Sequence, residues 1–183
     1  MKTLSCKIVG TTPLLMHAPT GVGAVKTTKK VTTYDPEDEA KKGLYVNKEG
    51  KIFVPAMALL GCLREAGKQH KAPGRGKQSL KALIMSGIRI FPEEVIVSPQ
   101  TWEIDARTAV IQRQRIMRWR PRFDIWELSF DLKILDEDTL SPSQIREVLS
   151  DAGKYNGLLD FRPFFGTFTV KSCIDNDTKK EVK

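Results

Sequence analysis

The segment from residue 126 to residue 134 constrains the fold more than any other part of this sequence. Its apolar side chains occupy every second position: Trp126, Leu128, Phe130, Leu132 and Ile134. The intervening side chains are polar or charged, and successive side chains of a strand point to opposite faces of a sheet. The pattern therefore predicts a central strand with one face covered by other elements.

Other stretches of the 183-residue chain are arranged around this strand in a regular order. Apolar periodicity and turn residues predict strands at 4–9, 88–91, 94–97, 126–134 and 167–173, and helices at 35–43, 56–68, 78–85 and 142–152. The order strand, helix, strand, strand, helix, strand is typical of an α+β, ferredoxin-like (RRM-like) βαββαβ core. We expect a single domain with two insertions, at about 17–50 and 69–113, and a frayed tail at 174–183. Residues 17–34 show no apolar period and predict an exposed loop.

A glycine lies in the middle of the predicted helix 56–68, at position 61. Glycine in a helix interior costs about 1 kcal/mol relative to alanine. We therefore expect another backbone to approach the helix closely at Gly61.

Three cysteines are spread widely along the chain, without a Cys-x-x-Cys pair or a histidine cluster. This spacing predicts neither a disulfide framework nor a zinc site, and no metal ion or other cofactor is expected. With Phe168 and Val170 on the inner face of the last strand, alternation puts Cys173 on the face opposite to that of Cys6.

The sequence has no run of about 18 consecutive apolar residues, the length that a membrane-spanning helix needs. Its first residues lack the apolar segment and the cleavage site of a secretory signal. We therefore expect a cytoplasmic protein that has no membrane partner.

Positive charge is concentrated in the first two thirds of the chain. The sequence has 30 Lys and Arg against 22 Asp and Glu, a net charge of +8. Residues 1–122 hold 22 basic and 10 acidic side chains, whereas residues 123–183 hold 8 and 12. Such concentration points to a polyanionic partner such as a nucleic acid.

The segment 107–122 contains six arginines and no carboxylate. They fall on odd and even positions, so both faces of a strand would be charged, and we expect a protruding arginine-rich β-hairpin. Single-stranded nucleic acid needs cations for its phosphates and rings on which bases stack. The candidate binding residues are Arg107, Arg113, Arg115, Arg118, Trp119, Arg120 and Arg122. The alternative is a solvated hairpin whose arginines pair with the acidic carboxy-terminal third.

Two loops carry further candidate contacts. The first is either a second phosphate-binding stretch or a solvated loop, and its basic residues are Lys68, Lys71, Arg75, Lys77 and Lys81. In the second, between Gly157 and Gly166, Arg162 either binds nucleic acid or pairs with Asp160. This second loop also contains three aromatic residues for which core packing is favoured over base stacking: Phe161, Phe164 and Phe165.

Three segments together form a recognisable set. The first predicted strand is followed by Thr12-Pro13-Leu14, residues 55–64 read PAMALLGCLR, and Gly157 to Gly166 precede the last strand. These segments resemble the RAMP superfamily, the RNA-binding proteins that form the backbone of CRISPR effector complexes. Members of that family have a Thr-Pro-Leu turn, a helix start PGSSLKGxLR and a glycine-rich loop at these places. Small phage proteins that share the family's core are similar too.

The resemblance implies a non-catalytic protein that binds single-stranded RNA and assembles side by side along it, as one subunit type of a ribonucleoprotein. Further ribonucleoprotein subunits are implied as partners. The ribbon at 107–122 would correspond to the family's thumb-like hairpin, and Arg162 lies in the loop with which the family grips RNA. An alternative is a phage protein of the same fold that coats single-stranded DNA or RNA or interferes with host defence.

Two residues are weak candidates for catalysis. His17 follows the first strand, where related RNA-processing endonucleases often keep a general base, and a metal-independent endoribonuclease is therefore another alternative. Asp35 lies in the insertion where some family members carry the carboxylate for cleavage of target RNA. Neither residue has a visible partner in the sequence, and Asp35 before Pro36 is better explained as a helix N-cap.

Overall fold

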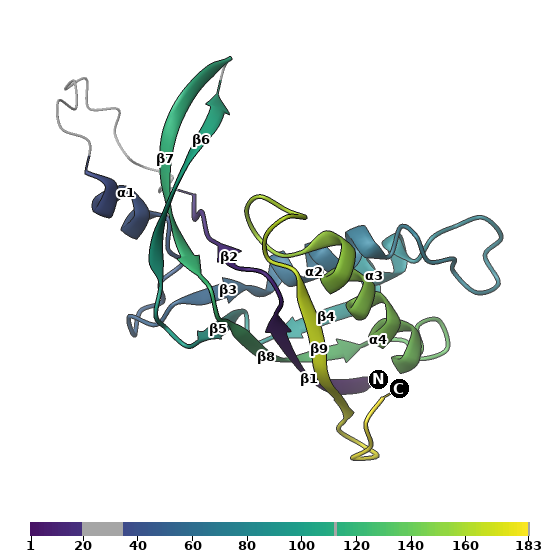
Figure 1. Ribbon diagram of the computed structural model, residues 1–183. Helices are drawn as coiled ribbons and strands as arrows, with labels where there is room; N and C mark the ends of the chain where they lie inside the picture. Colours follow the sequence, from purple (N-terminus) through teal and green to yellow (C-terminus); the bar gives the residue numbers. More distant parts are fainter. Residues whose placement is uncertain (20–34, 112, 183) are drawn as a thin grey trace.

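The computed structural model describes residues 1–19, 35–111 and 113–182 (Figure 1). These residues form a mixed α+β structure with antiparallel sheets and four α-helices. In the main sheet, β8 (Glu127–Ile134) pairs along its whole length with β1 (Lys2–Gly10). Every second residue of β8, beginning with Leu128, is buried, and so is Trp126. The predicted central strand with one covered face is confirmed.

Shorter strands extend this pair on both sides. β9 (Phe168–Asp175) pairs with β1, while β4 (Ile88–Phe91) and β5 (Glu94–Ser98) pair with opposite ends of β8. β3 (Phe53–Pro55) pairs with β5. All these pairings are antiparallel, and the order across the middle of the sheet is β4-β8-β1-β9.

Three α-helices cover one face of the main sheet (Figure 1). They are α2 (Ala56–Ala66), α3 (Lys81–Gly87) and α4 (Pro142–Asp151), and α4 continues into the π-helical turn η1 (Ala152–Asn156). α4 begins with a capping box, in which the Gln144 amide donates to the Ser141 hydroxyl and the Gln144 side chain accepts from the Ser141 amide. This cap satisfies backbone amides that the first helical turn leaves unpaired.

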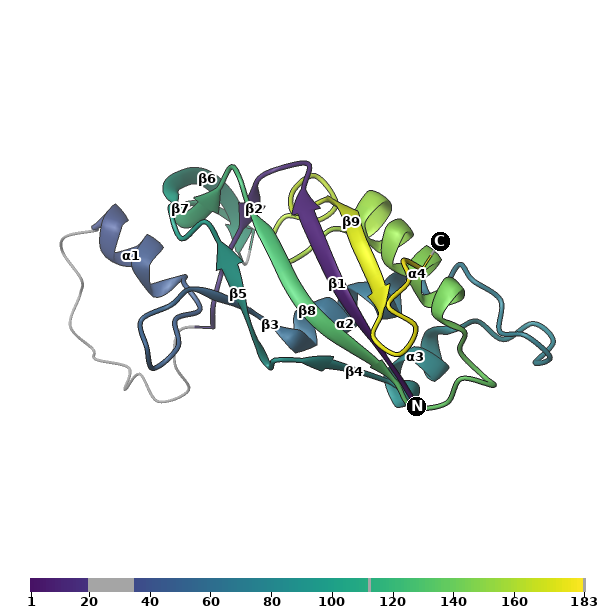
Figure 2. The same cartoon turned by 90° about the horizontal axis from the view of Figure 1, so that it is seen from below.

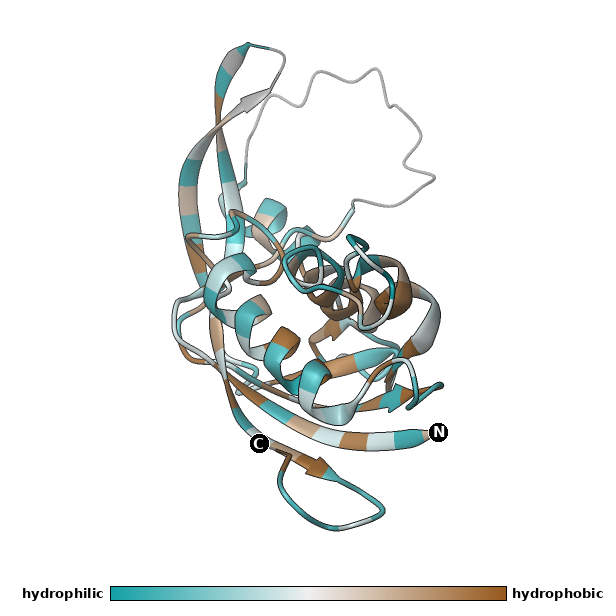
Figure 3. Ribbon diagram, turned by 90° about the vertical axis from the view of Figure 1, so that its right-hand side faces the viewer, coloured by the Kyte–Doolittle hydropathy of each residue, from teal (hydrophilic) through white to brown (hydrophobic). Residues whose placement is uncertain are grey.

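The core lies between these helices and the sheet. Leu59 and Leu63 of α2, Val148 of α4, and Leu4 and Ile8 of β1 are all buried in one cluster. Figure 3 shows the alternation along the strands of the main sheet as successive brown and teal bands. The opposite face of β1 and β8 is polar, and it is joined by cross-strand pairs such as the Lys7–Glu127 ion pair at 2.9 Å.

A second, three-stranded sheet contains the predicted hairpin. β6 (Glu103–Ile111) pairs with β7 (Gln114–Phe123), and β7 pairs at its other end with β2 (Leu14–Leu15). We call β6 and β7 the arginine ribbon. It projects away from the main sheet (Figure 1), as predicted, and begins at Glu103. The short helix α1 (Pro36–Lys42) contacts β7 near the base of the ribbon.

The two cysteines at the edge of the main sheet contradict their predicted placement. Lys7 pairs with Ser172 whereas Ile8 pairs with Val170, so β9 has an extra residue at this point. Such a β-bulge breaks the alternation of side chains, and Cys173 therefore lies directly opposite Cys6, with 3.3 Å between the buried Sγ atoms. The hydrogen bond with Cys173, together with burial, raises the pKa of Cys6.

Gly61 also differs from expectation. A Cβ atom built at Gly61 would meet nothing within 4 Å, so no other described backbone approaches the helix there. The expectation of close approach is wrong, because the glycine faces a cavity described below.

The last residues of the chain are ordered as far as Val182. The Val182 amide donates to the Cys173 carbonyl at 2.8 Å, and the Asp175 amide donates to the Lys180 carbonyl at 3.0 Å. The expected frayed tail is therefore corrected to a turn that folds back on β9. Of the predicted exposed loop, residues 20–34 lie outside the described residues.

Candidate nucleic-acid interface

The loop from Gly157 to Gly166 is closed at its base by its two glycines. Both have a φ angle of 72°, a region in which glycine is unstrained. The Leu158 amide donates to the Gly166 carbonyl at 2.9 Å, and a Cβ at Gly166 would lie 2.1 Å from the Leu158 oxygen. The Gly166 amide also donates to the Pro13 carbonyl at 2.8 Å, which ties the loop to the turn after β1.

Two arginines hold the base of the arginine ribbon against this loop. The Arg120 Nε atom lies 2.5 Å from Asp160 Oδ2, and the Arg120 guanidinium carbon lies 4.9 Å from the centre of the Phe161 ring. The Arg107 guanidinium carbon lies 4.4 Å from the centre of the Phe165 ring. Cation–π contacts of this kind contribute about 0.5–2 kcal/mol each. The ribbon and the loop therefore form one continuous surface, which we call the ribbon–loop surface.

The aromatic residues of the loop do not pack in the core. The Phe161 and Phe165 rings lie edge to face, with 6.4 Å between their centres, and both side chains are half-buried against arginines. Phe164 is 83% exposed. The prediction of core packing is wrong for all three, because Phe161 and Phe165 pack against arginines of the ribbon and Phe164 faces solvent. On β7, Trp119 is half-buried.

Carboxylates pair with four of the six arginines of the ribbon. The pairs are Arg107 with Asp105, Arg118 with Glu39, Arg120 with Asp160 and Arg122 with Asp124, at N–O distances of 2.6, 2.9, 2.5 and 2.6 Å. Only Asp124 and Asp160 belong to the acidic carboxy-terminal third, so the predicted alternative holds for two pairs. The hydrogen bond with Asp124 raises the pKa of Arg122. Arg120 is buried, which removes it from the exposed set that the sequence predicted.

The tip of the ribbon differs from its base. Arg113 and Arg115 are exposed, and neither forms an ion pair with any described residue. The tip stands clear of the rest of the molecule in Figure 1. These two guanidinium groups are therefore available to an anionic ligand.

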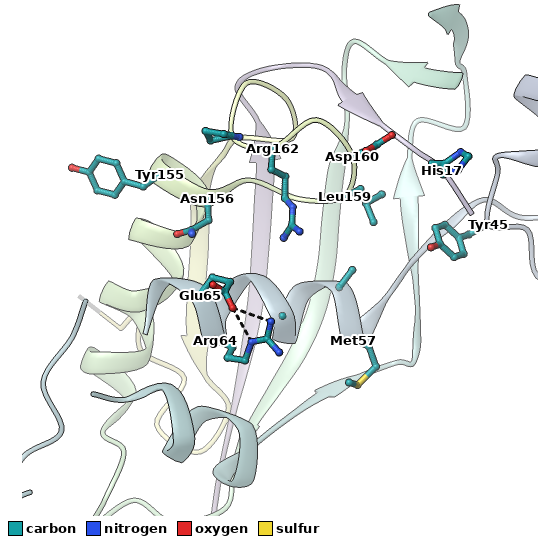
Figure 4. Close-up of a pocket in the computed structure, with 13 residues that line it drawn as sticks. His17, Tyr45, Met57, Arg64, Glu65, Tyr155, Asn156, Leu159, Asp160 and Arg162 are labelled. Carbon is teal, nitrogen blue, oxygen red and sulfur yellow. Dashed lines mark hydrogen bonds and ion pairs between the residues drawn. The ribbon is translucent and has the colours of Figure 1, made fainter. Parts of the chain in front are cut away.

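A cavity of about 670 Å³ opens beside the loop (Figure 4). Residues of α2, η1, the loop and the segment after β2 line it. Arg162 is exposed and points into this cavity, and it forms no ion pair within the described part of the chain. Because Asp160 is held by Arg120, the predicted alternative of an Arg162–Asp160 pair is not what the structure contains.

The cavity wall adds groups that the sequence analysis missed. The Asn156 Oδ1 atom is buried and accepts no hydrogen bond from the described residues. Tyr45, Tyr155 and Gly61 also line the cavity, and no described atom of another element lies within 4 Å of the position that a Cβ would take at Gly61. Arg64 also lines it, and its Nη2 atom pairs with Glu65 at 2.9 Å. No local sequence signal could have assembled these residues, because they come from distant elements.

The basic loop at 68–81 lies apart from the ribbon. Figures 1 and 2 both place the segment between α2 and α3 at the opposite end of the molecule from β6 and β7. Lys68 pairs with Glu65, and the other basic side chains are exposed: Lys71, Arg75, Lys77 and Lys81. The two basic stretches therefore do not form a single surface.

The two catalytic candidates are placed differently. His17 is exposed and lines one end of the cavity that Arg162 enters (Figure 4). Asp35 caps α1, since its side chain accepts from the Glu37 amide at 3.0 Å. The prediction of Asp35 as an N-cap is confirmed.

Among the described residues, no group of three or more His, Cys, Asp or Glu side chains is placed to hold a metal ion. The helices in this part of the chain are all too short or too polar to cross a membrane. No protein-family model matches the chain, and no curated protein matches it.

Proposed function

We propose that this protein binds single-stranded nucleic acid, preferably RNA, without cleaving it. The observation that carries this proposal is the attachment of the ribbon to the loop by Arg107 and Arg120. It brings the arginine ribbon, Arg162 and the exposed Phe164 onto one surface. Cations together with exposed rings are what single-stranded nucleic acids need for binding.

Each group on this surface has a defined role in the proposal. Arg113 and Arg115 neutralise phosphates, because they are exposed and paired with no described carboxylate. Phe164 and Tyr155, which are 83% and 51% exposed, provide rings on which bases stack. Arg162 attracts a phosphate or a base into the cavity. Because phosphates and π-faces are common to all nucleotides, binding is sequence-tolerant.

The same proposal includes a RAMP-like, ferredoxin-like core with insertions at about 17–50 and 69–113. The order β4-β8-β1-β9 supports it, as does the position of α2 between β1 and β4 along the chain and of α4 between β8 and β9. The projecting ribbon is consistent with a thumb-like hairpin.

We further propose that copies assemble side by side along RNA in the cytoplasm, as a backbone-type subunit of a CRISPR-like ribonucleoprotein. The reach of the ribbon tip beyond the main sheet supports contact with nucleotides bound to a neighbour. A phage protein that coats single-stranded DNA or RNA, or interferes with host defence, uses the same contacts and differs in its ligand or target.

The direct test is fluorescence anisotropy with labelled oligouridine and oligothymidine of about ten nucleotides, over a range of salt concentrations. We expect affinity to fall steeply with salt. Combining Arg113→Ala with Arg115→Ala should reduce the slope of log K against log salt by about 1.4, because each phosphate contact on a single strand contributes about 0.7. The ratio of the two affinities measures the preference for RNA.

A matched control removes the same charge elsewhere. Lys48 and Lys180 are exposed and lie outside the ribbon–loop surface, and Lys48→Ala with Lys180→Ala should leave the slope unchanged. Failure to bind either oligonucleotide, or an equal effect in the control, contradicts the proposal.

Assembly is tested by light scattering on freshly purified protein, before and after separate RNase and DNase treatment. A high-mass species that dissociates after RNase treatment supports assembly along RNA. One that dissociates only after DNase treatment favours the single-stranded DNA alternative. A 20.6 kDa monomer at every concentration of added RNA argues against assembly.

A metal-independent endoribonuclease is the second candidate, because His17 lines the same cavity as Arg162. A histidine and a cation that line one cavity are groups that general base catalysis on RNA can use. If purified protein cleaves RNA in the presence of a chelator, His17→Ala must abolish the cleavage. Cleavage that persists in that variant excludes this role for His17.

A further inference from the structure

A second, open cleft of about 380 Å³ lies between α4 and the start of β9. It shares no lining residue with the cavity that Arg162 enters. Its polar lining residues are Thr11, Arg146, Ser150, Lys154, Thr167 and Thr169. No carboxylate is among the described residues that line it, so the cleft is both positively charged and rich in hydroxyl groups.

Arg146 on α4 lacks a partner for part of its guanidinium. Its Nε atom is buried and makes no hydrogen bond to any described residue, and the side chain forms no ion pair with them. A buried donor left unsatisfied costs about 1–3 kcal/mol, and more when it is charged. The positive charge of Arg146 also contributes to lowering the pKa of Cys173, after the larger effect of the hydrogen bond with Cys6. Because Arg146 lines the cleft, an anion bound there would offset its unpaired positive charge.

The remaining lining groups suit an oxyanion. Lys154 supplies a second cation, and Asp151, a nearby carboxylate of α4, is engaged by His70 with 2.9 Å between Nε2 and Oδ2. The Thr11 and Thr167 hydroxyls lie 2.7 Å apart, so one donates to the other, and the Ser150 and Thr169 hydroxyls supply further donors in the cleft. Several hydroxyl donors around two cations are the chemistry that binds phosphate oxygens.

We propose that this cleft is a phosphate site, with Arg146 and Lys154 as the charged ligands and the threonine hydroxyls as further donors. The inference goes beyond the proposed function, because it does not depend on the ribbon–loop surface. The phosphate belongs either to a nucleic-acid backbone or to a free phosphate compound, and the two sources share this recognition chemistry.

The test uses inorganic phosphate as the probe. Thermal unfolding is followed with increasing phosphate, against chloride at equal ionic strength, because a ligand at concentration L that binds only the folded state stabilises it by RT ln(1 + L/Kd) and so raises Tm as its concentration increases. We expect a phosphate-specific rise in Tm that Arg146→Gln and Lys154→Gln each reduce. Lys154 is exposed, so its variant should fold even if that of Arg146 does not.

The outcomes separate this site from the ribbon. The Arg113→Ala and Arg115→Ala double variant should keep the full phosphate effect. No phosphate-specific rise in the wild-type protein, or an equal rise in Lys154→Gln, overturns the proposal. The Lys154 Nζ atom also lies 4.8 Å from the centre of the Tyr155 ring, so Arg146→Gln rather than Lys154→Gln identifies the source of the phosphate. If Arg146→Gln weakens the binding of oligouridine, the source is a backbone phosphate, and if it does not, the source is a free phosphate compound.

Discussion

The base and the tip of the arginine ribbon contain the same side chain in one run of sequence, but they have different surroundings. At the base, each arginine faces a carboxylate that lies 2.5–2.9 Å away: Arg107, Arg118, Arg120 and Arg122. At the tip, Arg113 and Arg115 face no described carboxylate. A paired guanidinium must give up a charge-assisted hydrogen bond before it can bind a phosphate. The arginines of the base therefore stabilise the ribbon, whereas those of the tip are available to a ligand.

This difference shows that the number of arginines in the segment overstates the number of guanidinium groups that are available to a ligand. At the base, the Arg120 guanidinium forms an ion pair with Asp160 and lies over the Phe161 ring, and both contacts hold the ribbon against the loop. The following experiments test the division between base and tip, from the largest expected effect to the smallest.

The largest effect should come from Arg120→Met. This change leaves the Asp160 carboxylate, which is one third exposed, without its cation and removes the stacking on Phe161. We expect the free energy of unfolding to fall by about 2 kcal/mol, less than for a fully buried pair. Urea unfolding measures it, with Arg113→Met as the matched control at the tip. Equal stability of the two variants would remove the distinction between base and tip.

The next effect concerns the exposed ring of the loop. Phe164→Ala should leave the free energy of unfolding unchanged and weaken oligouridine binding by about 1–3 kcal/mol, if a base stacks on the ring. Ile125, which is 75% exposed, provides the control, since Ile125→Ala removes apolar surface without an aromatic face. Similar binding by the two variants would exclude stacking on Phe164.

A smaller effect on oligouridine affinity is expected when an arginine of the base loses its carboxylate partner. Asp124→Asn removes the carboxylate that holds Arg122, leaving only Asp105 at 3.5 Å. We expect oligouridine affinity to rise by a factor of about 3, since an exposed ion pair is worth roughly 0.2–1 kcal/mol. Anisotropy at low salt detects it, and Asp138→Asn, which neutralises an exposed carboxylate outside the ribbon, corrects for net charge. An unchanged affinity would show that Arg122 does not reach the ligand.

The smallest effect is expected from the basic loop. A triple change of Lys71, Arg75 and Lys77 to alanine removes charge at the end of the molecule opposite the ribbon. A short oligonucleotide on the ribbon–loop surface should lose affinity by less than a factor of about 3, because exposed charges more than a Debye length apart are screened. A loss as large as that of the tip double variant would place the main site at the loop instead.

Much of the fold was predictable from local pattern. The alternation in β8, the capping box at Ser141 and the N-cap at Asp35 depend on residues within a few positions of one another, and all three were found. The ribbon was predictable for the same reason, because charge on both faces excludes a strand from the core. The boundaries of the elements were predicted less accurately. The sequence predicted a helix that begins at residue 78, whereas α3 begins at Lys81.

The sequence by itself therefore determined the elements, the concentration of positive charge and the projection of the ribbon. The tertiary structure alone decided which arginines are paired, because Glu39 lies 79 residues from Arg118 and its proximity depends on the packing of α1. It also decided the Cys6–Cys173 contact, since one extra residue in β9 reverses the alternation that the pattern assumed. Periodicity describes neighbours along the chain, whereas ion pairs, cavities and bulges depend on neighbours in space.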